Sequence, residues 1–263
     1  GIRAVVRELV ASWRDRGAAG RGAVDLAQEL AWPMPFDVFF HLMGMPGRQE
    51  KDPLERARRE QLEHWTHALK DRVPGTPHLT PVARAATAGV QQFFIDLLEE
   101  RRRPGRDDLV TQFVHADIDG VPFVDAEVTP NSEVSGLMMI LFLGGVESTA
   151  GLTGTLFKLL AANPDQRALL QAAPSLIPAA VEEALRLITP LQLTARTTSR
   201  EVTLHGVTMP AGSRVVLIPG AANRDERQFP DPDRFDVTRG RMRHLGFGEG
   251  RHGCLGAPLA RLE

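Results

Sequence analysis

The longest apolar segment of the chain runs from Asp125 to Asn163 and places the strongest constraint on its fold. Thr129 and Pro130 are typical of a helix start, and Asn163 followed by a proline is typical of a helix end. Residues 137–143 (LMMILFL) are apolar without interruption, so a helix here has no polar face. Some thirty helical residues span roughly 45 Å, a domain diameter. We therefore expect one long central helix covered by the rest of the chain.

The remaining sequence predicts a mainly α fold with a small antiparallel β part. Helical spacing covers residues 2–16, residues from 25 onward with breaks at Pro33 and Pro35, residues 55–70, and residues 81–103 after the cap Thr80. Short β-type segments follow Pro190, over residues 202–204, 207–209 and 214–218. No stretch of linker composition divides the chain, so we expect a single domain over residues 1–263.

Charge and cysteine content exclude several classes of protein. A chain of 263 residues with a net charge of −2 has no electrostatic preference for nucleic acid or an anionic membrane. No apolar run free of charge reaches the about 18 residues of a membrane span. One cysteine excludes an internal disulfide framework and favours a reducing interior. We expect a cytoplasmic protein that acts as a monomer.

The only cysteine, Cys254, lies in a glycine-dense loop, residues 247–256 (FGEGRHGCLG), just before an apolar helix-forming tail. Glycines let the backbone approach a large flat group, and the start of the following helix stabilises a sulfur anion. The pattern indicates a single thiolate metal ligand. A dinucleotide loop needs a preceding apolar strand, which residues 241–245 do not form, and a zinc site needs about four ligands. A buried, unreactive cysteine is the alternative.

This loop resembles the haem-binding loop of the cytochrome P450 family, Phe-Gly-x-Gly-x-His/Arg-x-Cys-x-Gly, at every fixed position. The resemblance implies that Cys254 is the proximal ligand of the iron of haem b. It also implies that His252 hydrogen-bonds a haem propionate and that Phe247, Gly248 and Gly256 belong to the haem-binding loop. Upstream, Arg196 occupies the place of a second propionate partner in the family; a surface arginine on an edge strand is the alternative.

Residues 144–149 (GGVEST) interrupt the apolar central segment with glycines, an acid and hydroxyls. They resemble the central-helix motif of the same family, Ala/Gly-Gly-x-Asp/Glu-Thr-Thr/Ser. The resemblance implies that Glu147 and Ser148 deliver protons during oxygen activation. Ser148 stands where the family usually has threonine and lacks the methyl group that restricts the rotamer, so we expect looser coupling of electron use to product. A glycine-kinked helix whose serine bonds back to its own turn is the alternative.

The sequence also carries a candidate structural triad. Glu183 and Arg186 lie three residues apart and can pair on one helix face. Residues 229–235 (FPDPDRF) resemble the family's meander, which implies that Arg234 completes a Glu-Arg-Arg cluster. We expect this cluster to fix the loop that carries Cys254. A solvated surface pair is the alternative.

The resemblance implies a soluble bacterial type of haem-thiolate monooxygenase with a partial cytochrome P450 fold. Such an enzyme inserts one oxygen atom from O2 into an apolar small molecule, with electrons from a ferredoxin- or flavodoxin-like donor and ultimately from NAD(P)H. By correspondence, the substrate pocket includes Ile140, Leu143, Gln192 and Leu193. Two alternatives stay open, a peroxide-using peroxygenase and a haem-binding protein without turnover.

Two further expectations concern the surface and the ends of the chain. Arg241, Arg243 and Arg251 surround the cysteine loop in sequence and could dock an acidic electron donor, although ordinary solvated charge is the alternative. The chain starts at Gly1 inside an amphipathic pattern and stops at Glu263 inside a helical one. We therefore expect a domain that lacks both ends, and a membrane anchor upstream stays open.

Overall fold

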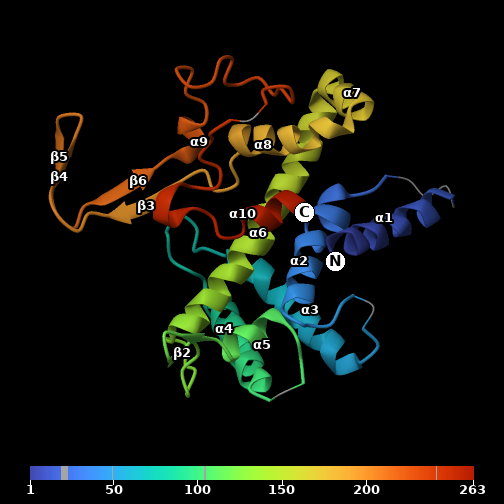
Figure 1. Cartoon of the computed structure of the whole chain (residues 1–263), viewed down its shortest axis with the longest axis vertical. Helices are drawn as coiled ribbons and strands as arrows, with labels where there is room; N and C mark the ends of the chain where they lie inside the picture. The colour runs from blue at the N-terminus through green and yellow to red at the C-terminus, as the bar shows by residue number, and fades with distance from the viewer. Residues whose placement is uncertain (19–22, 49, 104, 241) are drawn as a thin grey trace. The chain divides into compact units, whose positions relative to one another are not determined.

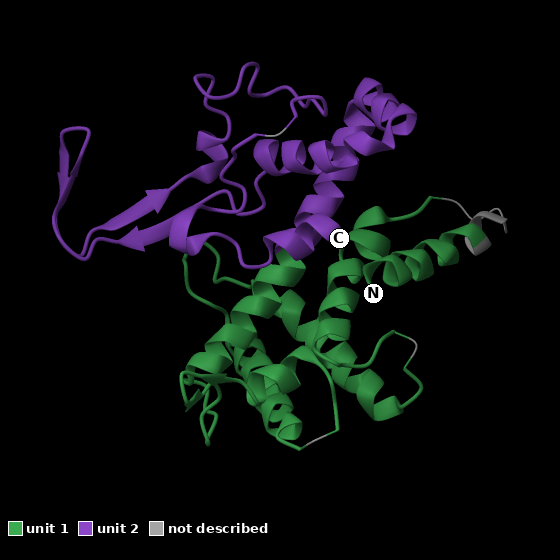
Figure 2. Cartoon of the chain, viewed as in Figure 1, with its two compact units in different colours: residues 1–147 green, residues 148–263 purple. Residues whose placement is uncertain are grey.

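The computed structural model describes residues 1–18, 23–48, 50–103, 105–240 and 242–263 (Figure 1). The described chain forms two compact units, residues 1–147 and residues 148–263 (Figure 2). The boundary between them falls inside the long helix α6 (Glu133–Ala162). Helices dominate and the strands form short antiparallel ladders, so the predicted fold class is confirmed. The single domain stays a prediction.

The first unit is built from helices around an aromatic core. It contains α1 (Ile2–Ala18), the π-helical turn η1 (Ala27–Ala31), α2 (Pro33–Leu42), α3 (Pro53–Ala68), α4 (Pro81–Arg101), α5 (Leu109–Val114), the strands β1 (Asp117–Ile118) and β2 (Val121–Pro122), and the first part of α6. Helices α2, α4 and α6 contribute a cluster of buried phenylalanine rings, Phe36, Phe39, Phe40, Phe94 and Phe142. Because each ring buries a large apolar area, this cluster holds the three helices together.

Capping side chains and prolines set where helices of the first unit begin. Asp52 accepts a backbone N–H at the start of α3 at 2.9 Å, and Thr80 accepts one at the start of α4 at 3.1 Å. Pro33 and Pro35 lie in the first turn of α2, where backbone N–H groups have no partner inside the helix. The break predicted at Pro33 is confirmed, because η1 ends at Ala31 and α2 begins at Pro33, whereas the break predicted at Pro35 is wrong, because α2 continues through it.

The second unit combines helices with short strands. It contains the last part of α6, α7 (Pro164–Ala172), the 3-10 turn η2 (Pro174–Leu176), α8 (Ile177–Leu187), β3 (Thr194–Thr197), β4 (Val202–Leu204), β5 (Val207–Met209), β6 (Arg214–Leu217), α9 (Pro219–Ala222), the 3-10 turn η3 (Gly250–His252) and α10 (Ala257–Leu262). Strands β3 and β6 pair antiparallel with Thr194 opposite Leu217, and β4 and β5 form a hairpin with Val202 opposite Met209. The sequence offered a strand at β3 only as the alternative for Arg196.

Helix α6 is less covered than its composition predicts. Its buried positions follow helical spacing, Val134, Met138, Phe142, Val146 and Thr149. Another face is exposed along its length, at Gly136, Ile140, Gly144, Glu147 and Ser148. Ile140 is 71% exposed, so the expectation of cover on every side is wrong for this face. Among the described helices, α6 alone is long and apolar enough to cross a membrane by length and composition, a test that core helices also pass.

Candidate functional site

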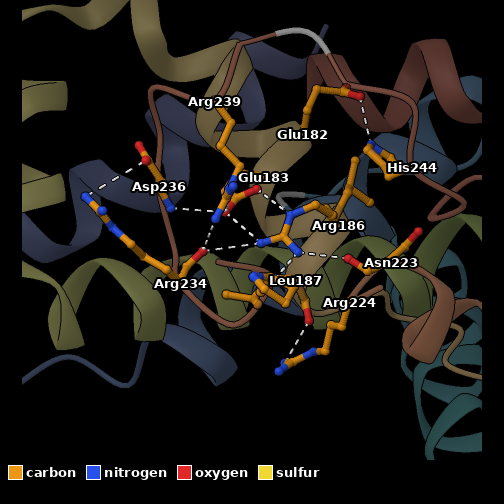
Figure 3. A network of polar contacts seen from close by, with 12 residues as sticks. Glu182, Glu183, Arg186, Leu187, Asn223, Arg224, Arg234, Asp236, Arg239 and His244 are labelled. Atoms are coloured by element: carbon orange, nitrogen blue, oxygen red, sulfur yellow. Dashed lines mark hydrogen bonds and ion pairs between the residues drawn. The ribbon is translucent and has the colours of Figure 1, made fainter. Parts of the chain in front are cut away.

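A buried ion pair on α8 organises the second unit (Figure 3). Glu183 and Arg186 lie one helical turn apart and are both fully buried. The guanidinium donates from Nε to Oε2 at 2.7 Å and from Nη2 to Oε1 at 2.9 Å. Paired hydrogen bonds of this kind satisfy both charges and fix their orientation. The burial excludes the alternative of a solvated surface pair.

The remaining donors of Arg186 reach a distant part of the chain. Nη1 donates to the carbonyl oxygens of Asn223 at 2.8 Å and Pro232 at 2.7 Å, and Nη2 donates to that of Arg234 at 3.3 Å. Three backbone carbonyls of a segment without regular secondary structure thus accept hydrogen bonds from one buried guanidinium. The ion pair therefore holds the irregular segment from residue 223 to residue 239.

The third arginine of this network is Arg239, and the prediction of Arg234 is wrong. Arg239 donates from Nε to Glu183 Oε1 at 3.0 Å, and its side chain is 14% exposed. The side chain of Arg234 is 61% exposed, and its nearest recorded carboxylate is Asp236, 3.9 Å away. Figure 3 shows the backbone carbonyl of Arg234 turned into the network. Because the carbonyl takes that place, the side chain lies outside.

The two arginines should differ in their contribution to stability. We expect Arg239→Ala to lower the free energy of unfolding by about 2 kcal/mol, since it removes a hydrogen bond to a buried carboxylate that keeps its second partner. Arg234→Ala should stay within about 0.5 kcal/mol, as exposed side chains do. Urea unfolding of both variants measures the difference. An equal or larger effect at Arg234 would support Arg234, and not Arg239, as the third arginine of the cluster.

Among the described residues, the side chains of Glu183, Arg186 and Arg239 have no recorded hydrogen bond to the cysteine loop, so that this cluster fixes the loop stays a prediction. The loop is attached through Asn223, whose Oδ1 accepts the N–H of Leu245 at 2.7 Å and whose Nδ2 donates to Thr189 Oγ1 at 2.7 Å. Asn223 is almost completely buried, and its carbonyl accepts from Arg186. Asn223 therefore links the ion pair to Leu245, two residues before the loop begins.

The loop presents Cys254 at the surface of the second unit. The thiol is free and exposed, so the alternative of a buried, unreactive cysteine is excluded. The backbone N–H of Cys254 donates to the carbonyl of Phe247 at 2.8 Å and closes the loop. Gly248 has a φ of +68°, and a Cβ there would lie 2.9 Å from the carbonyl oxygen of His252, so only glycine fits without a shift.

These residues fit a haem that is held by one protein sulfur. The described residues contain no group of three or more His, Cys, Asp and Glu side chains that could hold a metal ion, so Cys254 has no partner ligands of the zinc type. Leu255, beside the thiol, is one of the most exposed apolar side chains of the second unit. An exposed sulfur next to apolar surface on a pre-shaped loop matches the requirement of a flat, apolar group with one axial bond.

The two predicted propionate partners are both exposed. Arg196 lies on β3, opposite Val215 of β6, and donates to its neighbours Thr194 Oγ1 at 3.2 Å and Ala195 O at 2.8 Å. His252 lies at the end of η3. Both side chains therefore have polar atoms available at the surface, and their pairing with a propionate stays a prediction.

Glu147 has a partner that the sequence analysis missed. Lys70 Nζ lies 2.9 Å from Glu147 Oε1, and both side chains are 47% exposed. The same ammonium lies over the ring of Trp32 at 5.1 Å, and Trp32 stacks on His67 at 4.7 Å. The acid thus stands in a half-exposed cluster with a cation and aromatic groups, not alone in an apolar helix.

The other predicted positions divide between the two units. Ile140 and Leu143 lie in the first unit, and Gln192 and Leu193 lie in the second. That the four line one pocket stays a prediction. Ser148 follows directly after Glu147 on α6 and is exposed.

The predicted docking arginines are partly described. Arg243 is 80% exposed and pairs with Glu249, while Arg251 is exposed in η3. Arg241 lies outside the described residues. The pairing of Arg243 reduces the positive charge that this face offers to an acidic partner.

Several residues that organise the site were not predicted from the sequence, although each lies in or near a segment that the sequence marks. Arg239 lies four residues after the meander segment, and His244 lies three residues before the glycine-rich loop. Asn223 belongs to the segment Asn-Arg-Asp, to which the sequence alone assigned no role. Their contacts join residues up to 62 positions apart, so local spacing does not reveal their partners.

Comparison with known proteins assigns the family. The family model "Cytochrome P450" matches residues 1–263. The 6-deoxyerythronolide B hydroxylase of Saccharopolyspora erythraea is 36% identical over 262 residues, 100% of this chain and 60% of that protein. The cyclomarin C epoxidase CymV of Salinispora arenicola is 36% identical over 267 residues, 100% of this chain and 62% of that protein.

Solved structures agree with the sequence comparison. The cytochrome P450 PksS of Bacillus subtilis superposes with a TM-score of 0.84 at 29% identity, over 99% of this chain and 62% of that one. The chain thus spans about 60% of the length of the curated relatives that it matches. The match covers every residue of the chain, including the cysteine loop and the α8 ion pair. The chain belongs to the cytochrome P450 family.

Proposed function

We propose that the chain forms the haem-thiolate part of a monooxygenase, an oxidoreductase that inserts one oxygen atom from O2 into an apolar small molecule. The observation that carries this proposal is the free, exposed thiol of Cys254 on a loop whose shape is set by glycines and backbone hydrogen bonds. Hydroxylation and epoxidation, the reactions in the names of two relatives, are both within this class.

Cys254 would bind the iron of haem b, and His252 and Arg196 would bind its propionates. Phe247, Gly248 and Gly256 would shape the loop around the sulfur. When bound, the haem supplies the centre at which oxygen is activated, and a thiolate ligand favours cleavage of the O–O bond. The loop would keep the thiolate in place.

Glu147 and Ser148 would deliver the protons that the reaction consumes. A carboxylate next to a hydroxyl can pass protons from water, each group moving one at a time. Lys70 holds the Glu147 carboxylate by an ion pair at 2.9 Å, which orients the acid. Because this pair is half exposed, the carboxylate can exchange protons with solvent.

The substrate would be bound by apolar contacts. Ile140, Leu143 and Leu193 are apolar, and Gln192 adds one polar group that can orient an oxygen-bearing substrate. Electrons would come from a ferredoxin- or flavodoxin-like donor, ultimately from NAD(P)H, and Arg251 would contribute to its docking face. We propose a cytoplasmic, monomeric protein.

The reduced carbon-monoxide difference spectrum of the haem-loaded protein tests the proposal. We expect the strongly red-shifted band of a thiolate ligand, and Cys254→Ala should abolish it while Glu226→Gln, a change at an exposed position of the same unit, leaves it intact. A band that survives Cys254→Ala would refute the proposed ligand. Product formation with peroxide but without a reductant would favour a peroxygenase instead.

A further inference from the structure

Glu182, the residue before Glu183, contacts residues on both sides of the cysteine loop. Glu182 Oε2 lies 3.0 Å from His244 Nε2. Figure 3 shows this contact, and the histidine lies three residues before the loop begins at Phe247. Glu182 Oε1 accepts from Arg261 Nε at 2.5 Å, and Oε2 accepts from Arg261 Nη2 at 3.2 Å. Arg261 belongs to α10, which follows the loop. One carboxylate on α8 thus holds both ends of the segment that carries Cys254.

The contact with His244 is directional. The backbone N–H of Gly246 donates to His244 Nδ1 at 3.0 Å, so the ring proton sits on Nε2 and donates to Glu182. The side chain of His244 is almost completely buried, and a Cβ on Gly246 would lie 3.0 Å from both His244 Nδ1 and the carbonyl of Leu185. The histidine therefore transmits the position of Glu182 to the backbone at the start of the loop.

The contact with Arg261 has an electrostatic side. The guanidinium lies over the ring of Phe247 at 4.6 Å. Its hydrogen bond to Glu182 raises the pKa of Arg261, and electrostatic interaction with Cys254 adds a smaller rise. Burial alone would raise the pKa of the Glu182 carboxyl, but hydrogen bonds from Arg261 and His244 lower it below its ordinary value. Glu182 is therefore the anion that balances a cation near the sulfur.

We propose that Glu182 is a positioning residue for the thiolate ligand: it holds both ends of the cysteine loop and offsets the positive charge that Arg261 places near the sulfur. This inference rests on the proposed function, because it assigns the role through the haem ligand Cys254. It separates the two neighbouring acids of α8. Glu183 orders the segment from residue 223 to residue 239, and Glu182 serves the loop.

The charge balance makes a prediction that a purely mechanical role would not make. In the haem-loaded protein, Glu182→Gln leaves Arg261 uncompensated, and an extra positive charge favours the reduced state. We therefore expect the midpoint potential to shift to more positive values in Glu182→Gln and to more negative values in Arg261→Gln. The double variant removes both charges and should lie between the two single variants, near the unmodified protein. Glu226→Gln is the matched control and should shift little.

The mechanical part of the proposal has its own measurement. Loss of a charge-assisted hydrogen bond should let the loop open more often, so the thiolate band of the reduced carbon-monoxide complex should decay about tenfold faster in Glu182→Gln. Shifts of the same sign in both single variants, or decay no faster than in Glu226→Gln, would overturn the proposal. An unmodified protein without any thiolate band would instead refute the proposed function. The two failures are thus distinguishable.

Discussion

Replacing Arg186 by methionine is expected to lower the free energy of unfolding of the protein by about 3 to 5 kcal/mol. The substitution leaves the fully buried carboxylate of Glu183 with Arg239 as its only recorded arginine partner. It also removes the donors for the carbonyl oxygens of Asn223 and Pro232, which lie 2.8 and 2.7 Å from Arg186 Nη1. Since whole domains are stable by only about 5 to 15 kcal/mol, this loss is a large part of the total.

The control for this prediction is another arginine of the same unit. Arg227 is 87% exposed and pairs with Asp225, so Arg227→Met should cost under about 1 kcal/mol. The double variant Glu183→Met with Arg186→Met should cost less than the sum of the two single changes, because neither charge is then left unpaired. Urea unfolding followed by circular dichroism measures all four proteins. Equal costs at Arg186 and Arg227 would contradict the reading of the ion pair as a buried anchor.

The sequence predicted those parts of the fold that depend on local pattern. Helix α4 begins at the predicted cap, because Thr80 accepts an N–H group three residues along the chain, whereas α3 begins at Pro53, two residues before the predicted start, after the cap Asp52. Periodicity also located α6, although the helix begins at Glu133, three residues after the predicted start signal Pro130. Pro33 marks the predicted break between η1 and α2, but Pro35 misled the prediction, since a proline in the first turn of a helix does not interrupt it.

Strand β3 shows a different limit of local pattern. Its sequence TART is short and polar, with no alternation of apolar residues. It becomes a strand because Thr194 to Thr197 find backbone partners on β6, about twenty residues later in the chain. Local propensity cannot contain that pairing.

In the candidate site too, local patterns could be found from the sequence and long-range contacts could not. The cysteine loop could be found from sequence because its glycines and its thiol stand within ten residues. The pair of Glu183 and Arg186 could be found from its spacing of three, but its burial could not. The identity of the third arginine could not be predicted, because the motif does not determine whether the carbonyl or the side chain of Arg234 faces the ion pair. The partners of Glu182 lie 62 and 79 positions away, so only the fold reveals them.

Replacing Glu147 by glutamine is expected to slow reductant-driven O2 consumption by about a hundredfold or more, with a larger solvent deuterium isotope effect. Glutamine keeps the shape of the side chain and its hydrogen bonding but cannot pick up and release a proton. The thiolate band of the reduced carbon-monoxide complex should remain, because Cys254 belongs to a separate loop. A variant with normal O2 consumption would remove Glu147 from the proton path.

The substitution Lys70→Met tests whether the reaction requires proton transfer by Glu147 or its ion pair with Lys70. The substitution removes the cation that lies 2.9 Å from Glu147 but leaves the carboxylate itself in place. A half-exposed ion pair is worth under about 1 kcal/mol, so the rate should change by about fivefold or less in either direction. A loss at Lys70 as large as that at Glu147 would mean that the ion pair as a unit, and not proton transfer by the carboxylate, is what the reaction requires. The comparison of the two variants under the same O2 assay therefore decides which property of Glu147 the enzyme uses.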